Sequence, residues 1–158
     1  MSRQGLTFHS TSPDETAKAA ARVAQELKTG DVVLLAGDVG AGKTHFARHL
    51  IQSILDAPED VPSPTFTLVQ VYETQRGALW HSDLYRITSV FEIEELGLTE
   101  AFETAICLVE WPDRLGELKP QNALTLTFLQ GDAETHRDIV AAWEDPRWDT
   151  AFLNWGAS

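Results

Sequence analysis

Basic residues are scarce in this sequence, and acidic residues outnumber them by two to one. The chain has 12 Lys and Arg against 24 Asp and Glu, which gives a formal net charge of −12. Direct binding to nucleic acid requires a basic surface, so this charge opposes it. The same charge is compatible with docking to a basic protein. We therefore expect no strong direct binding to RNA.

Cysteine and long apolar runs are also lacking. Cys107 is the single cysteine, which excludes a disulfide framework within the chain and predicts a buried, unreactive thiol. No run of about 18 apolar residues exists, so no membrane span is expected. The N-terminus lacks the basic-then-apolar pattern of a secretion signal. These absences predict a cytoplasmic protein, and the 158 residues predict a single domain over 1–158.

What the sequence does contain is a glycine-rich pattern at residues 37–44. It reads Gly37-Asp38-Val39-Gly40-Ala41-Gly42-Lys43-Thr44, which matches the P-loop pattern G-x-x-x-x-G-K-[ST]. A short apolar run at 32–36 comes before it, and apolar residues at helical spacing follow it as far as Ile54. The motif therefore lies between a predicted strand and a predicted helix, which is the arrangement that phosphate binding needs.

The chemistry of this loop follows from its residue types. Backbone amides and the positive end of the following helix favour a phosphate ligand. Lys43 is placed to bridge the β- and γ-phosphates, and Thr44 is placed to offer its hydroxyl to Mg²⁺. The sequence thus predicts nucleotide binding by seven residues, namely Asp38, Val39, Gly40, Ala41, Gly42, Lys43 and Thr44.

Two acidic residues follow strand-like runs and compete for the magnesium side of the site. Five apolar residues at 105–109 lead to Glu110, and a shorter apolar run leads to Asp83. Acids at the carboxyl ends of strands are where α/β proteins place ligand chemistry. The longer apolar approach favours Glu110 as the metal ligand beside Thr44, with Asp83 nearer the γ-phosphate. Two alternatives stay open: Asp83 as a turn cap, and His81 as a packed residue instead of a catalytic base.

A stiff loop at residues 61–70 carries two prolines around Ser63 and continues to Thr65. One interpretation is a switch-like segment in which the Thr65 hydroxyl approaches Mg²⁺ or the γ-phosphate. The other is an ordinary loop, since Ser, Thr and Pro are common turn formers. The residues alone do not decide between them.

The order of the predicted elements indicates an α/β fold. A helix begins at Ser12-Pro13 and runs to about Leu27, and an acidic helical segment at 89–102 is broken by Gly97. Alternating segments at 123–129 and 137–142 predict a C-terminal β-hairpin. We therefore expect a P-loop NTPase-type three-layer domain with a mixed, mainly parallel central sheet. The tail at 143–158 holds three of the five tryptophans, and either packs on the domain or contacts another protein.

Four segments together are similar to one family. They are the P-loop, Ser63-Pro64-Thr65-Phe66-Thr67-Leu68-Val69, His81-Ser82-Asp83-Leu84-Tyr85-Arg86 and Leu108-Val109-Glu110-Trp111-Pro112. In order and spacing they resemble the TsaE (YjeE) family from about residue 10 to about residue 142. The tail after Trp143 is not covered by this resemblance.

The resemblance implies a function and a set of partners. It implies a Mg²⁺-dependent ATPase, slow in isolation, that supports N6-threonylcarbamoyladenosine modification of tRNA by acting on a TsaB–TsaD heterodimer. Its cofactors would be ATP and Mg²⁺, with Thr44 and Glu110 as metal ligands. Lys43 would contact phosphates, Thr65 and Asp83 would lie near the γ-phosphate, and Trp111 would lie beside the site. Self-association is left open.

Two other classes of P-loop protein fit less well. A small-molecule kinase would need a mobile lid with arginines, and no Arg-rich segment exists in the chain. It remains the alternative function. A GTPase would need an Asn/Thr-Lys-x-Asp segment to recognise guanine, and none of the three lysines outside the P-loop is followed by such an acid.

Overall fold

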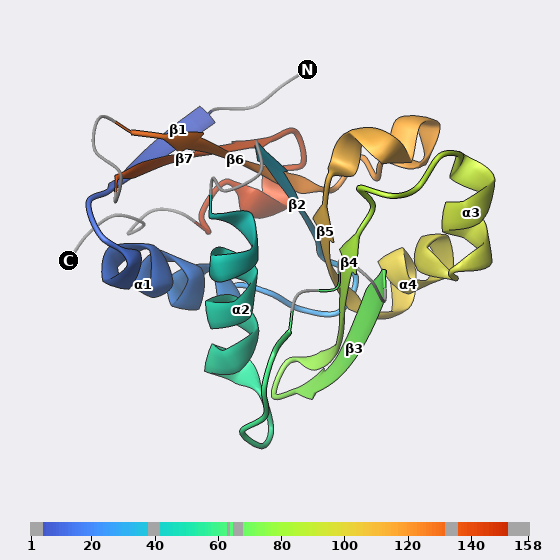
Figure 1. The fold of residues 1–158 in the computed structure, drawn as a ribbon, viewed down its shortest axis with the longest axis horizontal. Coiled ribbons are helices and arrows are strands. Elements are labelled where there is room, and N and C mark those ends of the chain that lie inside the picture. Colours follow the sequence, from blue (N-terminus) through green and yellow to red (C-terminus); the bar gives the residue numbers. More distant parts are fainter. Residues whose placement is uncertain (1–4, 38–41, 63, 65–67, 132–135, 152–158) are drawn as a thin grey trace.

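The computed structural model describes residues 5–37, 42–62, 64, 68–131 and 136–151. Four helices and seven strands alternate along these ranges (Figure 1). In chain order they are β1 Gly5–Ser10, α1 Pro13–Ala24, β2 Val32–Gly37, α2 Lys43–Ile54, β3 Val69–Thr74, β4 Gly77–Asp83, α3 Val90–Glu95, α4 Leu98–Thr104, β5 Ile106–Glu110, β6 Leu124–Gln130 and β7 Arg137–Trp143. Two 3₁₀ segments, Pro112–Leu118 and Pro146–Trp148, follow β5 and β7.

The strands that the structure describes form one seven-stranded sheet in the order β1-β7-β6-β2-β5-β4-β3. The four central strands, β6, β2, β5 and β4, are parallel neighbours. The pairs β1–β7, β7–β6 and β4–β3 are antiparallel. Because β1 is antiparallel to β7 and β7 to β6, β1 runs with the four central strands. The mixed, mainly parallel sheet and the C-terminal hairpin β6–β7 are therefore confirmed.

Helices cover both faces of the sheet, which makes three layers (Figure 1). Alternate residues of β2 explain why: Val33 and Leu35 belong to the core cluster under α1 and α2, whereas Val32 and Leu34 belong to the cluster under α3 and α4. A strand whose two faces are both buried reads as a continuous apolar run, as β2 does. The P-loop strand thus lies at the centre of the molecule.

Helix α1 begins where the sequence predicts and ends earlier. The Ser12 side chain accepts the amide of Glu15 at 3.1 Å, and the Glu15 carboxylate accepts the amide of Thr11 at 2.7 Å. Ser12 thus caps the helix, while Glu15 binds the residue before the cap, one position earlier than in a capping box. The helix ends at Ala24, short of the predicted Leu27, because residues 26 and 27 form tighter three-residue turns.

The hairpin β3–β4 is a feature that the sequence analysis did not predict. Its ladder pairs Thr74 with Gly77 at the turn and Val69 with Ser82 at the open end. β4 is also parallel to β5, so Asp83 lies opposite Glu110. The pairing of β4 with β5 therefore determines which side chains meet Glu110.

The first part of the Trp-rich tail packs against the domain. Trp148 is fully buried and its indole N–H donates to the Asn122 carbonyl at 2.8 Å. Trp143 donates to the Asp149 carboxylate at 2.9 Å. The Arg147 guanidinium donates to both oxygens of Asp31, at 2.8 and 2.6 Å. For the described part of the tail, up to Ala151, the packing interpretation is correct.

The single cysteine, Cys107, is buried and unreactive, as the sequence predicts. The Cys107 side chain is fully buried in β5, and burial raises the pKa of its thiol to about 12. A thiol held in its protonated form is a poor nucleophile, so it is inert. Among the helices that the structure describes, none is both long and apolar enough to cross a membrane.

We expect Trp148→Ala to lower the free energy of unfolding by about 3–5 kcal/mol, the usual range for removing a large buried aromatic side chain. The substitution also leaves the Asn122 carbonyl without its indole donor. Phe91→Ala is the control, because the Phe91 side chain is 67% exposed and its loss creates no cavity. Urea unfolding measures the free energy of unfolding of both variants. If both variants lose the same amount, burial of Trp148 does not stabilise the domain.

Candidate functional site

The described site residues lie where the carboxyl ends of β2, β4 and β5 approach the first turn of α2. Leu35 of β2 and Asp83 of β4 both lie opposite Glu110 of β5 in the parallel ladders. Their neighbours on the same strand faces, Val33, Leu79 and Leu108, belong to the core cluster under α2. The polar ends of these strands therefore stand on an apolar layer and face the start of α2.

Gly37 and Gly42 shape the two ends of the P-loop. Gly37 has φ +130°, and a Cβ at this position would lie 2.5 Å from the Phe128 carbonyl oxygen. Gly42 has φ +103° and directly precedes α2, so Lys43 is the first residue of the helix. A side chain is excluded at Gly37 by the neighbouring strand β6, and both glycines adopt a conformation that L-residues rarely take. The pattern's first and last glycines thus have a steric basis.

The Lys43 side chain contacts the start of the P-loop and the residue that follows β5. Its Nζ donates to the Gly37 carbonyl at 2.6 Å and lies 3.6 Å from the centre of the Trp111 ring. A cation over an indole face is attracted by the ring quadrupole, and more strongly when water is excluded. Lys43 is only 5% exposed. The ammonium group of Lys43 therefore has a defined position, between the Gly37 carbonyl and the Trp111 ring.

The Trp111 ring owes its place to the end of β5. Trp111 follows Glu110 directly and has a left-handed backbone, with φ 60° and ψ 55°. This turn ends the strand and brings the indole over Lys43. The Tyr85 ring packs against the Trp111 ring, and the two ring centres lie 4.8 Å apart. The predicted position of Trp111 beside the site corresponds to this contact.

Thr44 and Glu110 form the second polar contact of the site. The Thr44 hydroxyl donates to Glu110 Oε1 at 3.0 Å. Two oxygens in neighbouring positions around one Mg²⁺, each at roughly 2.1 Å from the ion, lie about 3 Å apart. Both the donor chemistry and the separation therefore fit a magnesium ion held by these two side chains.

No group of three or more His, Cys, Asp or Glu that could hold a metal occurs within the described ranges. A hydroxyl and one carboxylate make an incomplete shell. Mg²⁺ commonly keeps several waters and binds through one or two carboxylates together with substrate phosphates. The site therefore fits a metal that arrives with a nucleotide better than one bound by protein alone.

His81 contacts the other oxygen of the same carboxylate. His81 Nε2 lies 2.7 Å from Glu110 Oε2, and the imidazole is fully buried. A catalytic base must reach the substrate or its water, and a ring with no exposed surface does not. Of the two interpretations of His81, the structure favours the packed residue.

Asp83 lies beside Glu110 and is 5% exposed. Its Oδ1 accepts the amide of Tyr85 at 3.0 Å, so the turn-capping contact exists. The backbone at this corner is fixed as well, since the Leu84 amide donates to the Glu110 carbonyl at 3.1 Å. The turn cap is therefore present, and the role of Asp83 near a γ-phosphate stays a prediction.

Five predicted site residues lie outside the described residues: Asp38, Val39, Gly40, Ala41 and Thr65. The other five, Gly42, Lys43, Thr44, Asp83 and Glu110, are described, and the fold brings them together from the start of α2 and the ends of β4 and β5. Their assigned roles in binding and catalysis stay predictions.

The comparisons with known proteins agree with this geometry. The family model described as threonylcarbamoyl adenosine biosynthesis protein TsaE matches residues 10–139. This chain belongs to the TsaE family. The match covers the P-loop, both acidic strand ends and most of the C-terminal hairpin.

Individual relatives carry the same family name. A Bacillus subtilis protein named tRNA threonylcarbamoyladenosine biosynthesis protein TsaE is 39% identical over 138 residues, covering 86% of this chain and 85% of that protein. A Treponema pallidum protein of the same name is 36% identical over 134 residues, covering 84% and 97%. A Rickettsia felis relative is 45% identical over 105 residues, and the match spans only 61% of its length.

Among solved structures, the TsaE-family chain is similar to the crystal structure of Bacillus subtilis YdiB. The TM-score is 0.76 at 29% sequence identity, and the match covers 96% of this chain and 93% of that one. The similarity thus extends over nearly the whole fold.

The structure also adds a residue that sequence reasoning missed in this TsaE-family chain. Arg137 opens β7, and its Nε lies 3.8 Å from the position that a Cβ would take on Gly42. Its guanidinium also donates to the His136 carbonyl at 2.8 Å. Nothing local in the sequence points to this residue, because it reaches the P-loop only through the pairing of β7 with β6.

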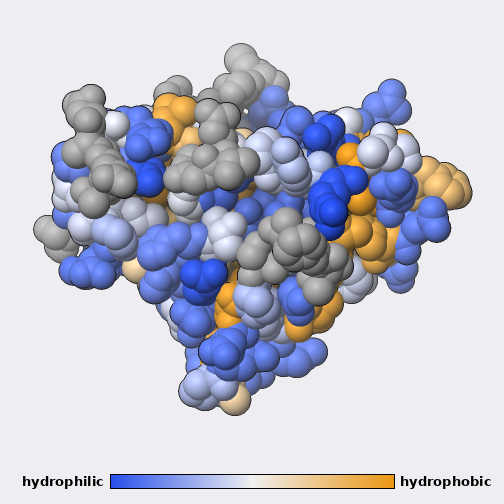
Figure 2. All heavy atoms as spheres, in the orientation of Figure 1, coloured by the Kyte–Doolittle hydropathy of each residue, from blue (hydrophilic) through white to orange (hydrophobic). Residues whose placement is uncertain are grey.

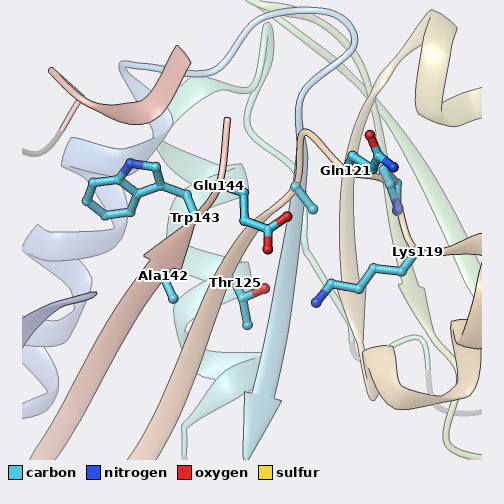
Figure 3. A pocket seen from close by; sticks show the side chains of 8 residues that line it. Lys119, Gln121, Thr125, Ala142, Trp143 and Glu144 are labelled. Carbon is cyan, nitrogen blue, oxygen red and sulfur yellow. The ribbon is translucent and has the colours of Figure 1, made fainter. Parts of the chain in front are cut away.

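A cavity of about 230 Å³ lies at the opposite end of the sheet (Figure 3). Lys119 and Glu144 extend toward it from opposite sides, near the start of β6 and the end of β7. Its full lining is Lys119, Pro120, Gln121, Ala123, Thr125, Ala142, Trp143 and Glu144. Since β2 and β6 are parallel, this cavity is separate from the P-loop end and shares no residue with the candidate site.

We expect Gly37→Ala to destabilise this TsaE-family protein more than Gly30→Ala does. Both glycines have positive φ, at +130° and +96°, but only at Gly37 would the added Cβ meet backbone, whereas nothing lies within 4 Å at Gly30. Overpacking costs typically about 1–3 kcal/mol, so the free energies of unfolding should differ by that amount. Urea unfolding of the two variants measures the difference, and equal values would contradict the steric account of Gly37.

Proposed function

We propose that this TsaE-family chain binds ATP with Mg²⁺, hydrolyses ATP slowly, and supports threonylcarbamoyladenosine modification of tRNA. One observation carries the nucleotide part: the Thr44 hydroxyl and Glu110 Oε1 lie 3.0 Å apart at the first turn of α2. The separation suits one magnesium ion, and the helix start suits the phosphates that accompany it.

Each residue of the site would have a distinct task. Lys43 would exchange the Gly37 carbonyl for the β- and γ-phosphates, and the loop amides would bind the remaining phosphate oxygens. Thr44 and Glu110 would hold Mg²⁺, which neutralises charge on the phosphates during transfer. Asp83, two strands from the P-loop strand, would orient the attacking water near the γ-phosphate, as would the Thr65 hydroxyl. We expect turnover by the isolated chain to be slow.

The proposed partner is a TsaB–TsaD heterodimer, and not tRNA itself. A net charge of −12 disfavours a phosphate backbone as a direct ligand. Exposed apolar side chains offer a protein-binding surface instead: Tyr85 is 50%, Val90 42% and Phe91 67% exposed. Figure 2 shows apolar surface on the side of the molecule where α3 lies. Tyr85 also packs against the ring of Trp111. Such patches commonly mark contact sites.

The cellular setting follows from the same proposal. A chain with one buried cysteine needs no oxidising compartment. We therefore expect it to act in the cytoplasm, where it would meet the partner heterodimer.

We expect Lys43→Ala to abolish the ability of the protein to restore threonylcarbamoyladenosine in a cell that lacks it. The substitution removes the cation that would bind the phosphates. Lys119→Ala is the matched control, since Lys119 is an exposed lysine beside the distant cavity. Mass spectrometry of tRNA nucleosides measures the modification. Restoration by Lys43→Ala would overturn the proposed role of ATP.

We also expect nucleotide to control the association with a TsaB–TsaD pair. A pull-down with the purified pair, performed with ATP and again with ADP, should recover more of it in one state than in the other. Phe91→Ala tests the apolar surface in the same assay and should weaken recovery in both states. Failure to recover the pair in either state would contradict the proposed partner.

A further inference from the structure

His81 is a polar residue held in the interior by the sheet itself. Its side chain is fully buried, and its backbone lies in β4 between β3 and β5, opposite Gln70 and Leu108. A side chain on a central strand is placed more firmly than one on a loop, because the ladders on both sides fix its backbone. The imidazole therefore has little freedom to move away from Glu110.

The carboxylate of Glu110 depends on this imidazole. Glu110 is 2% exposed, and a buried carboxylate is costly unless donors meet its oxygens. The described residues supply one side-chain donor to each oxygen: Thr44 to Oε1 at 3.0 Å and His81 to Oε2 at 2.7 Å. Removing His81 would leave Oε2 without its donor, and the carboxylate would be free to rotate.

The surroundings of His81 Nδ1 indicate which atom donates the hydrogen in the contact between His81 Nε2 and Glu110 Oε2. His81 Nδ1 is buried and has no hydrogen-bond partner among the described residues. A carboxylate only accepts, so the hydrogen must be on Nε2, and Nδ1 then needs no acceptor. If the hydrogen were on Nδ1, that nitrogen would be a buried donor without an acceptor. Nε2 and the carboxylate oxygen would then be two acceptors facing each other with no hydrogen between them. The geometry thus selects the tautomer with its hydrogen on Nε2.

We propose that His81 is a positioning residue: it holds Oε2 of Glu110 so that Oε1 faces Thr44, and it takes no proton from the attacking water. The inference rests on the proposed function, because it concerns the carboxylate proposed to hold Mg²⁺. The contact itself belongs to the protein without ligand, so it is testable separately.

The first experiment examines the protein without nucleotide or metal. Nitrogen NMR of ¹⁵N-labelled imidazoles distinguishes a protonated from an unprotonated ring nitrogen. We expect one fully buried histidine, lost in His81→Gln, to show a protonated Nε2 and an unprotonated Nδ1. In Glu110→Gln this Nε2 signal should shift. A hydrogen on Nδ1, or signals that do not respond to Glu110→Gln, would overturn the proposal whatever the protein binds.

The second experiment measures how much Mg²⁺ is needed to bind a non-hydrolysable ATP analogue. Loss of residues that orient a metal ligand typically weakens metal binding about 10–100-fold. We expect His81→Leu to raise the half-saturating Mg²⁺ concentration by that factor. His81→Gln, whose amide nitrogen can still donate to Oε2, should restore most of the loss. In EDTA the analogue should bind wild type and both variants alike.

His9 provides a matched control. Its Nδ1 lies 2.7 Å from Asp138 Oδ1, a histidine–carboxylate contact of the same length, but the His9 side chain is 73% exposed on the outer strand β1. His9→Leu should leave the Mg²⁺ requirement unchanged. If His81→Leu binds as wild type does, or loses affinity equally in EDTA, the positioning role is wrong. If wild type itself shows no Mg²⁺-dependent binding, the proposed function fails, while the NMR result still decides the His81–Glu110 contact.

Discussion

The buried carboxylate of Glu110 is the constraint on which the rest of the site depends. A charge at this depth is tolerated only when both oxygens receive donors. Thr44 comes from the first turn of α2 and His81 from the middle of β4. One side chain of β5 thereby ties the P-loop helix to the neighbouring strand. Satisfying this charge fixes the relative positions of the elements that form the site.

The position of Lys43, the P-loop lysine, depends on the turn that directly follows Glu110. Trp111 follows Glu110, and its left-handed backbone turns the indole over Lys43. The Gly37 carbonyl completes the contact from the other end of the loop. The end of β5 and the end of β2 therefore both position the Lys43 side chain.

The opposite end of the molecule has a structural task. Arg147 and Asp31 form a salt bridge, with N–O distance 2.6 Å, that joins the tail to the residue just before β2. Trp148 and Asn122 add a second connection to the loop before β6. Because β2 leads directly into the P-loop, these contacts hold the far end of the strand that carries it. The described part of the tail thus packs at the end of the sheet opposite the P-loop.

The sequence by itself determined the features that depend on neighbouring residues. The P-loop needs its glycines, lysine and threonine at fixed spacing, and the strand that ends in Glu110 needs only a local apolar run. The Ser12 cap of α1 and the break at Gly97 are equally local, so their positions could be predicted. The three-layer fold followed because strands and helices alternate along the chain.

Only the tertiary structure decided which distant residues meet. The parallel pairing of β4 with β5 places His81 against Glu110, 29 residues away in sequence. Pairing of β7 with β6 brings Arg137 to Gly42, and burial of Trp148 showed that the described tail packs on its own domain. Each of these contacts depends on the order and register of the strands in the sheet. No local sequence pattern encodes that order, because any strand with two apolar faces could occupy a central position.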